Sequence, residues 1–359
     1  MKKTALLLAL ALVLTGCARA PQVPTAATEA ATLPTTSPVE TTLAVETTGE
    51  TTAPETEPQP ERFLLTFVGD CTLGANPGNY YADTGFIKTV GEDYGYPFRN
   101  VMDYFASDDG TFLNLEGPLT DEGYPMKKAH VFRGATAYVE ILTGSSVEGV
   151  TLANNHTQDY GATGYASTVE TLKQAGIPFV ERDSSTIVTL DCGLTVGIYG
   201  AVYYHIDVEA MRTQLAELSQ LADVVVFAPH WGTECTYAVT REQQEIGKVA
   251  IEAGADIVWG SHPHVLQPME TYQDGIILYS MGNFCFGGNI AAEDLDTAMI
   301  QIEILRDASG EVSLGAVQVI PCSLGSQEGI NNFQPTPYPQ DSQGYARVLA
   351  KLDGTFREG

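Results

Sequence analysis

The stretch at residues 257–264, IVWGSHPH, decides how this chain is organised. Its β-branched and aromatic residues predict a short buried strand. Pro263 then restricts the backbone to an extended or turn conformation just beyond that strand. In extended backbone, positions i and i+2 face the same side, so His262 and His264 can address one centre.

The same pattern, an apolar run that ends in polar residues, recurs along the chain. Continuous apolar runs indicate strands covered on both faces. In open α/β sheets, ligands bind beyond the carboxyl ends of the strands. We therefore expect one site assembled from distant segments. The runs are FLLTFVGD at 63–70, TFLNLEG at 111–117, EGVTLANNH at 148–156, VVVFAPH at 224–230 and IILYSMGNF at 276–284.

Helical periodicity between these runs predicts crossover helices. Apolar residues recur at intervals of three or four over 165–175, 208–221 and from about 241 to 253. Gly176 and Gly254 stand where a left-handed C-terminal cap would fall. Strands that alternate with helices make this an α/β protein.

The polar residues at the strand ends supply carboxylate, amide and imidazole donors. This mixture suits Mn, Zn or Fe without choosing among them, so we expect one or two divalent metal ions. A bound metal would activate water and draw the charge that develops on a displaced oxygen. The candidate ligands are Asp70, Glu116, Asn155, His230, His262 and His264.

Other polar residues are expected to support the ligands or to contact substrate. Asn154 is interpreted as a structural hydrogen-bonding residue, and Glu234 either orients an imidazole or is a solvated loop charge. Arg133 either holds an anionic group of the substrate or is a surface residue. The residues of this class are Asn114, Asn154, Arg133, Glu234 and Asn283.

The amino-terminal segment predicts export and lipidation. Lys2 and Lys3 precede an apolar stretch that is too short to span a bilayer, as in a signal peptide over residues 1–16. LTGC, ending at Cys17, resembles a bacterial lipobox, which implies a lipid-anchored, extracytoplasmic protein. An ordinary signal with an incidental cysteine is the alternative.

Composition divides the rest of the chain. Residues 17–61 are rich in Thr, Pro and Glu and predict a disordered linker after the lipidated cysteine. A single domain is expected at 62–325, followed by a C-terminal extension at 326–359 that either packs on the domain or is partly loose.

Charge and cysteine content exclude some classes of function. The formal net charge of −27 argues against nucleic-acid binding by a basic surface. It also disfavours an anionic substrate unless a divalent ion locally reverses the field. Cys71, Cys235 and Cys285 lie beside polar clusters and are interpreted as buried apolar residues rather than ligands, while one or two disulfides stay possible.

Taken together, the motifs resemble those of the bacterial CapA family, which are poly-γ-glutamate capsule synthesis proteins of the calcineurin-like metallophosphoesterase superfamily. The resemblance covers about residues 63–305 and implies a four-layer α/β/β/α sandwich with mixed sheets and metal at the strand ends. The matching motifs are GDCTLG at 69–74, NLEGPLT at 114–120, LANNHTQDYG at 152–161, HWGTE at 230–234, GADIVWGSHPHVLQPME at 254–270 and YSMGNF at 279–284.

The resemblance also implies roles for single residues. Asp70 would be the carboxylate ligand of the first strand, and Glu116 would take the place of the bridging acidic residue. His156 would stand beside the metal as the proton donor to a leaving oxygen. Two positions depart from the superfamily pattern, because Thr72 stands where a histidine is usual and Leu115 precedes Glu116 where Gly-Asp is usual.

Three functions are therefore considered. The leading hypothesis is a metal-dependent phosphoesterase-like protein in the synthesis, export or anchoring of a poly-γ-glutamate-like capsule polymer, with an anionic polymer or phosphoester substrate and membrane-bound synthesis proteins as partners. The second is a noncatalytic polymer-binding or assembly subunit that retains metal. The third is a general exported metallophosphodiesterase without a capsule role.

Overall fold

The computed structural model describes residues 59–203, 206–292 and 294–358. The chain divides into two units, Met1–Thr56 and Glu57–Gly359, and the described residues all belong to the second. The predicted signal peptide, the lipidated Cys17 and most of the linker lie outside them. Within the described ranges, no helix has the length and apolar character needed to cross a membrane.

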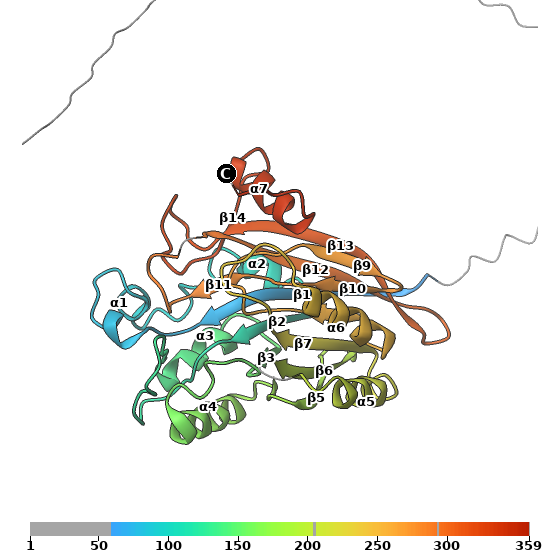
Figure 1. Cartoon of the computed structure of the whole chain (residues 1–359), viewed down its shortest axis with the longest axis horizontal. Coiled ribbons are helices and arrows are strands. Elements are labelled where there is room, and N and C mark those ends of the chain that lie inside the picture. The colour runs from blue at the N-terminus through green and yellow to red at the C-terminus, as the bar shows by residue number, and fades with distance from the viewer. Residues whose placement is uncertain (1–58, 204–205, 293, 359) are drawn as a thin grey trace, which may run out of the picture. The chain divides into compact units, whose positions relative to one another are not determined.

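Eight of the described strands form the first sheet, which runs through the middle of Figure 1. Its order is β14-β13-β12-β1-β2-β3-β4, with β11 paired to β1. Strands β1 to β4 and β11 run parallel, whereas β12, β13 and β14 pair antiparallel. The strands are β1 (Glu61–Thr72), β2 (Gly110–Leu115), β3 (Gly149–Thr151), β4 (Phe179–Val180), β11 (Asn283–Phe286), β12 (Asp296–Arg306), β13 (Val312–Ser323) and β14 (Thr336–Pro337).

The second sheet has the order β5-β6-β7-β8-β10-β9. Its four central strands are parallel, and β5 and β9 pair antiparallel at the two edges. Both sheets are therefore mixed. The strands are β5 (Ser184–Thr189), β6 (Thr195–Val202), β7 (Val224–His230), β8 (Ile257–Trp259), β9 (Met269–Tyr272) and β10 (Gly275–Leu278).

Alternation along β7 shows how the sheets are covered. Val224, Val226 and Ala228 pack in the core between the sheets, whereas Val225 and Phe227 pack in the core beneath the outer helices. Successive side chains of a strand point to opposite faces, so an uninterrupted apolar run fits a strand buried on both sides.

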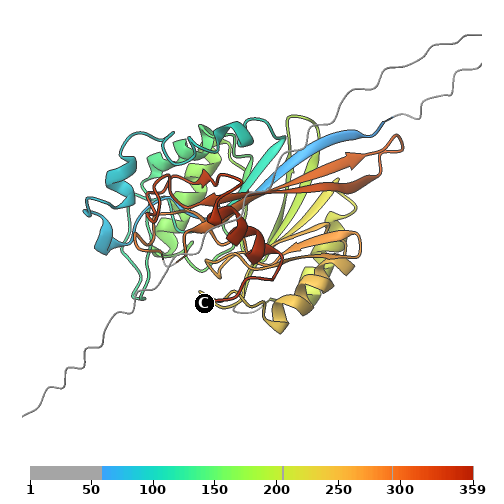
Figure 2. The same cartoon turned by 90° about the horizontal axis from the view of Figure 1, so that it is seen from above.

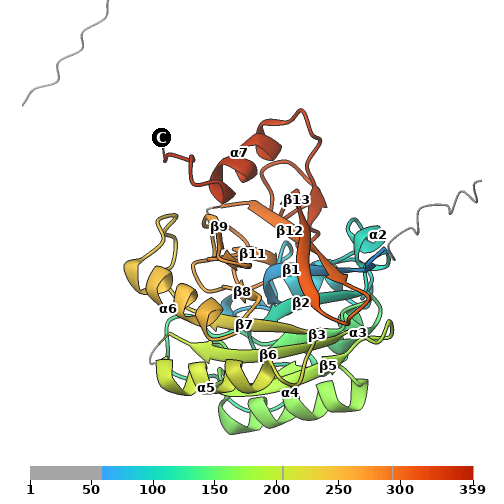
Figure 3. The same cartoon turned by 90° about the vertical axis from the view of Figure 1, so that its right-hand side faces the viewer.

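Helices cover the outer face of each sheet, which gives the expected four layers. Figure 3 shows α5 and α6 on one side of the unit and α2 and α3 on the other. The outer core of the first sheet includes side chains of α1 to α4, and that of the second includes α5 and α6. The helices are α1 (Phe86–Val90), α2 (Met102–Phe105), α3 (Val139–Thr143), α4 (Gly161–Ala175), α5 (Val208–Leu218), α6 (Arg241–Glu252) and α7 (Gln343–Leu352), with 3-10 turns η1 (Pro77–Asn79) and η2 (Thr136–Tyr138).

The C-terminal extension packs on the domain. Val348 and Leu352 of α7 belong to the core between the sheets, and the red helix lies over the middle of the unit in Figure 2. Lys351 is buried and forms ion pairs of 2.7 Å with both Asp294 and Asp296. These apolar and ionic contacts fix α7 against the start of β12.

No disulfide joins two cysteines of the described ranges. Cys71, Cys285 and Cys322 are buried in the outer core of the first sheet, among the side chains of its helices. They act there as small apolar residues, which confirms the prediction for Cys71 and Cys285. The same prediction is wrong for Cys235, which is exposed because it lies in the loop after β7 rather than in a core.

Candidate metal centre

The carboxyl ends of parallel strands from both sheets meet at one place. The backbone register of the first sheet puts Asp70 of β1 beside Asn114 of β2 and Asn283 of β11. In the second sheet an isolated bridge joins His230, the last residue of β7, to Ser261 beyond β8. The structure thus brings together the candidate ligands Asp70, Glu116, Asn155, His230, His262 and His264.

Glu116 occupies the centre of this arrangement. Its Oε1 lies 3.8 Å from Nε2 of His156, 3.9 Å from Nε2 of His230 and 3.8 Å from Nε2 of His264. The side chain is fully buried, and neither carboxylate oxygen has a hydrogen-bond partner in the described part of the chain. Burial raises the pKa of Glu116 well above its ordinary value, against the opposing effect of His264.

Such an arrangement fits a divalent cation. A buried carboxylate without a partner is costly, and a cation between it and the imidazole nitrogens would satisfy both. Carboxylate oxygen with imidazole nitrogen is a donor set that suits Mn, Zn or Fe. One donor atom from each of Asp70, Glu116 and His264 lies within 4.8 Å of the other two.

Asp70 is held by a network on the first-sheet side. Asn114 Nδ2 donates to Asp70 Oδ1 at 2.7 Å, and Nδ1 of His264 lies 3.1 Å from Asp70 Oδ2. Nδ1 of His264 also contacts Asn283 Oδ1 at 2.9 Å. Burial lowers the pKa of His264, but Glu116 and Asp70 outweigh it and raise this pKa to about 10. A proton and a metal therefore compete for this ring, since ligation requires neutral imidazole.

The second-sheet side supplies closely spaced imidazoles. Nε2 of His230 contacts Asn155 Oδ1 at 2.9 Å and Nδ1 of His262 at 3.1 Å. Nδ1 of His230 contacts the hydroxyl of Ser261 at 2.9 Å, and Tyr203 stacks on His262 with ring centroids 4.6 Å apart. Burial lowers the pKa of His230 well below its ordinary value and that of His262 to about 4. Both rings are neutral near pH 7, the form that ligates metal.

His156 is oriented by residues that the sequence analysis did not identify. Its Nδ1 lies 2.7 Å from Asp159 Oδ2, and Lys128 Nζ lies 2.5 Å from Asp159 Oδ1. Lys128 also donates to the carbonyl of Asn155 at 2.9 Å, while Phe132 stacks on the His156 ring with centroids 4.2 Å apart. Nε2 of His156 is left facing the centre. Burial lowers its pKa in spite of Asp159.

Asn154 fixes the loop that carries His156. Its Nδ2 donates to Asn114 Oδ1 and to the carbonyl of Leu115, both at 2.9 Å. Its Oδ1 accepts from the backbone N–H of His156 at 3.0 Å and from the Thr157 hydroxyl at 2.8 Å. The side chain therefore joins the end of β2 to the loop after β3.

Arg133 packs against two tyrosine rings. Its Nε donates to the Tyr80 hydroxyl at 2.7 Å, and its guanidinium lies over the rings of Tyr80 and Tyr160 at 4.9 and 5.3 Å. Arg133 lines a different cavity, with Tyr81 and Lys88. Arg133 thus packs among aromatic rings, and its contact with substrate stays a prediction.

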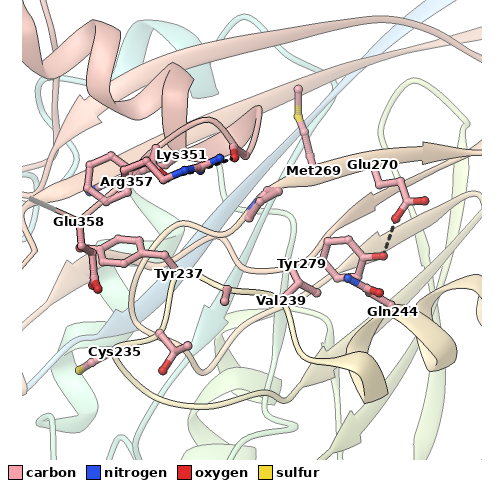
Figure 4. Close-up of a pocket in the computed structure, with 15 residues that line it drawn as sticks. Cys235, Tyr237, Val239, Gln244, Met269, Glu270, Tyr279, Lys351, Arg357 and Glu358 are labelled. Carbon is pink, nitrogen blue, oxygen red and sulfur yellow. Dashed lines mark hydrogen bonds between the residues drawn. The ribbon is translucent and has the colours of Figure 1, made fainter.

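Two neighbouring cavities flank the loop after β7. One, of about 450 Å³, adjoins the centre and is lined by residues that include His130, His156, Glu234 and His264. The other, of about 680 Å³, contains Met269, Tyr279 and Lys351 (Figure 4). Both are lined by Cys235, Tyr237 and Glu358, so this loop and the C-terminal tail form the wall between them.

Comparison with known proteins gives matches over most of the chain. The family model described as "Bacterial capsule synthesis protein PGA_cap" matches residues 64–288. The capsule biosynthesis protein CapA of Bacillus anthracis is 30% identical over 322 residues, which are 81% of this chain and 74% of that protein. The PGA biosynthesis protein CapA of Bacillus subtilis (strain 168) is 25% identical over 314 residues, 80% of this chain and 77% of that protein.

Among solved structures, the NAD nucleotidase of Haemophilus influenzae matches with a TM-score of 0.42 and 12% identity. The match covers 82% of this chain and 63% of the nucleotidase, so the chain spans less than two thirds of that protein's length.

Proposed function

The chain belongs to the family of bacterial capsule synthesis proteins, and from this premise we propose that it is a metal-dependent hydrolase. Its proposed role is in the synthesis, export or anchoring of poly-γ-glutamate or a related capsule polymer. The substrate is a phosphoester or the γ-amide polymer itself.

One observation carries the catalytic part of this proposal. The Glu116 carboxylate is fully buried, has no hydrogen-bond partner among the described residues, and is faced by three imidazole nitrogens at 3.8–3.9 Å. Such a group costs stability, and a cation bound beside it would offset that cost. When bound, a divalent metal supplies an activated water and draws the charge that develops on the displaced oxygen.

The residues around His156 prepare the transfer of a proton. Asp159 accepts from Nδ1 and fixes the ring, so Nε2 faces the centre and the adjoining cavity. From that atom a proton can pass to the leaving oxygen of a phosphoester or to the leaving nitrogen of an amide. Because burial lowers the pKa of His156, its protonated form is a stronger acid than free imidazolium.

The first residues and the charge support a proposed location and proposed partners. We propose that the protein lies outside the cytoplasm, anchored to a membrane through lipid on Cys17, with residues 17–61 as the tether. Because the protein has a net charge of −27, a bound metal is the group best suited to attract an anionic polymer. Membrane-bound capsule synthesis proteins are the proposed partners, and nucleic acid is not.

A noncatalytic role in polymer binding or assembly is the second candidate, and Thr72 favours it. This residue is buried beside the centre at the end of β1, and its hydroxyl has no hydrogen-bond partner within the described ranges. A threonine offers no imidazole, so the centre has one strong ligand fewer at this position.

The two candidates differ in turnover. Purified protein is analysed for bound metal, and its hydrolysis of a phosphodiester and of poly-γ-glutamate is measured. We expect His156→Ala to retain metal and lose hydrolysis, and His230→Ala to lose both. Metal without turnover in the wild type would favour the noncatalytic role, and a wild type that binds no divalent metal would refute the proposal.

A further inference from the structure

Given the metal-dependent function proposed above, on which this inference rests, we propose that Glu234 is a metal ligand. It holds the outer of two cations, together with His262 and His264, on the side of the centre that faces the cavity.

The donor atoms of these residues are close enough to share an ion. One atom from each of Glu234, His262 and His264 lies within 4.8 Å of the other two. On the buried side, donor atoms of Asp70, Glu116 and His264 also lie within 4.8 Å of one another, so His264 belongs to both groups. The donors therefore run from fully buried Glu116 to exposed Glu234, and each of the two groups could hold an ion of its own.

Backbone contacts hold Glu234 beside the histidines. The N–H of Cys235 donates to the carbonyl of Pro263 at 2.8 Å, which joins the loop after β7 to the loop after β8. Cys235, His262 and His264 all have positive φ angles, of 54°, 97° and 58°. Such angles cost a non-glycine residue conformational free energy, which surrounding contacts must offset. Residues with strained backbone of this kind cluster at functional sites.

The C-terminal segment braces the other side of the Glu234 loop. The Tyr237 hydroxyl donates to Asp294 Oδ2 at 3.0 Å, and its ring packs against Phe356 with centroids 4.9 Å apart. Lys351 Nζ lies 5.1 Å from the centroids of both rings. Figure 4 shows Tyr237 and Cys235 near the C-terminal Arg357 and Glu358. Glu234 thus extends from a loop fixed on both sides rather than from a freely moving one.

Charge balance also favours a second cation. Asp70, Glu116 and Glu234 bring three carboxylates to His264. Like charges so close in a partly buried site repel unless cations compensate them. One divalent ion near Glu116 leaves the Glu234 side without an equivalent partner.

The test is to titrate the full chain with Mn²⁺. Calorimetry measures the heat of binding, and electron paramagnetic resonance measures the free ion. We expect two equivalents in the wild type. In Glu234→Gln one equivalent should remain, and the other should weaken about 100-fold or more, since even supporting residues cost 10- to 100-fold in affinity. Glu358→Gln is the matched control, because it removes the same charge from the same cavity and should leave both equivalents unchanged.

Several outcomes would overturn the inference about Glu234. Wild-type stoichiometry and affinity in Glu234→Gln, or a single equivalent in the wild type, would show that Glu234 holds no outer ion. An equal loss in Glu358→Gln would show a general effect of charge. A wild type that binds no Mn²⁺ would refute the proposed function as well, whereas bound metal with hydrolysis that is unaffected by Glu234→Gln would leave that function standing.

Discussion

Glu116→Gln should stabilise the metal-free protein, although Glu116 lies at the centre of the site. The carboxylate is fully buried, and neither oxygen has a hydrogen-bond partner within the described ranges. The substitution removes the charge, keeps the shape and adds an amide that can donate to Nε2 of His156. Leaving a buried polar group unsatisfied costs roughly 1–3 kcal/mol, so the free energy of unfolding should rise by about that amount.

Manganese should reverse this order. A ligand at 1,000 times its dissociation constant stabilises the folded protein by about 4.1 kcal/mol. The wild type should gain that amount, and the variant, without the central carboxylate, should gain little. With Mn²⁺ the wild type should therefore exceed Glu116→Gln by roughly 1–3 kcal/mol.

Urea unfolding in chelator and in excess Mn²⁺ measures both differences. Glu140→Gln is the control, because Glu140 is an exposed residue of α3 and its substitution should change neither curve. A Glu116→Gln protein that is less stable than the wild type in chelator would refute the reasoning. The carboxylate would then already be satisfied without metal, and the central argument for a cation would fail.

Two further predictions concern regions outside the centre. Burial raises the pKa of Glu148 to about 7 from an ordinary 4.5, so its folded form binds a proton that the unfolded chain has released. The free energy of unfolding of the wild type, relative to Glu148→Gln, should therefore fall as pH rises from about 4.5 through 7, and a difference that is flat with pH in urea unfolding would contradict this. Lys351→Met should lose roughly 3–5 kcal/mol in the same assay, because buried Asp296 and half-buried Asp294 would both lose the ammonium. A loss under about 1 kcal/mol would mean that Arg347 compensates Asp296 without Lys351 and that Asp294 needs no ammonium.

The helices show which boundaries a sequence can predict. Helix α6 begins at Arg241 as expected, because Thr240 and Gln243 form a capping box that is visible in the sequence. Helix α5 ends at Leu218 rather than Leu221, since no glycine or proline marks its end and Leu221 is exposed. Helix α4 begins at Gly161, before its apolar periodicity becomes apparent, whereas its end at Ala175 and its left-handed cap at Gly176 were predicted.

The centre was predictable where its residues follow strands. Asp70, His230 and His262 could be identified because each ends or follows an apolar run. Lys128 could not, because it lies in a loop without periodicity and reaches Asp159 only through the tertiary fold. Asp159 lies three residues after His156, inside the motif LANNHTQDYG at 152–161. That short spacing was the available indication that its carboxylate contacts the His156 ring.

The two sheets contribute different chemistry to the centre. Asp70 and Glu116 extend from β1 and β2 of the first sheet, whereas His230 and His262 come from β7 and the loop after β8 of the second. A cation bound between them would join the sheets at the edge of their shared core, close to the point where Trp259 Nε1 donates across that core to the carbonyl of Val68 at 2.9 Å. Metal affinity should therefore depend on packing between the sheets as well as on the ligands, because a small shift of one sheet separates oxygen donors from nitrogen donors.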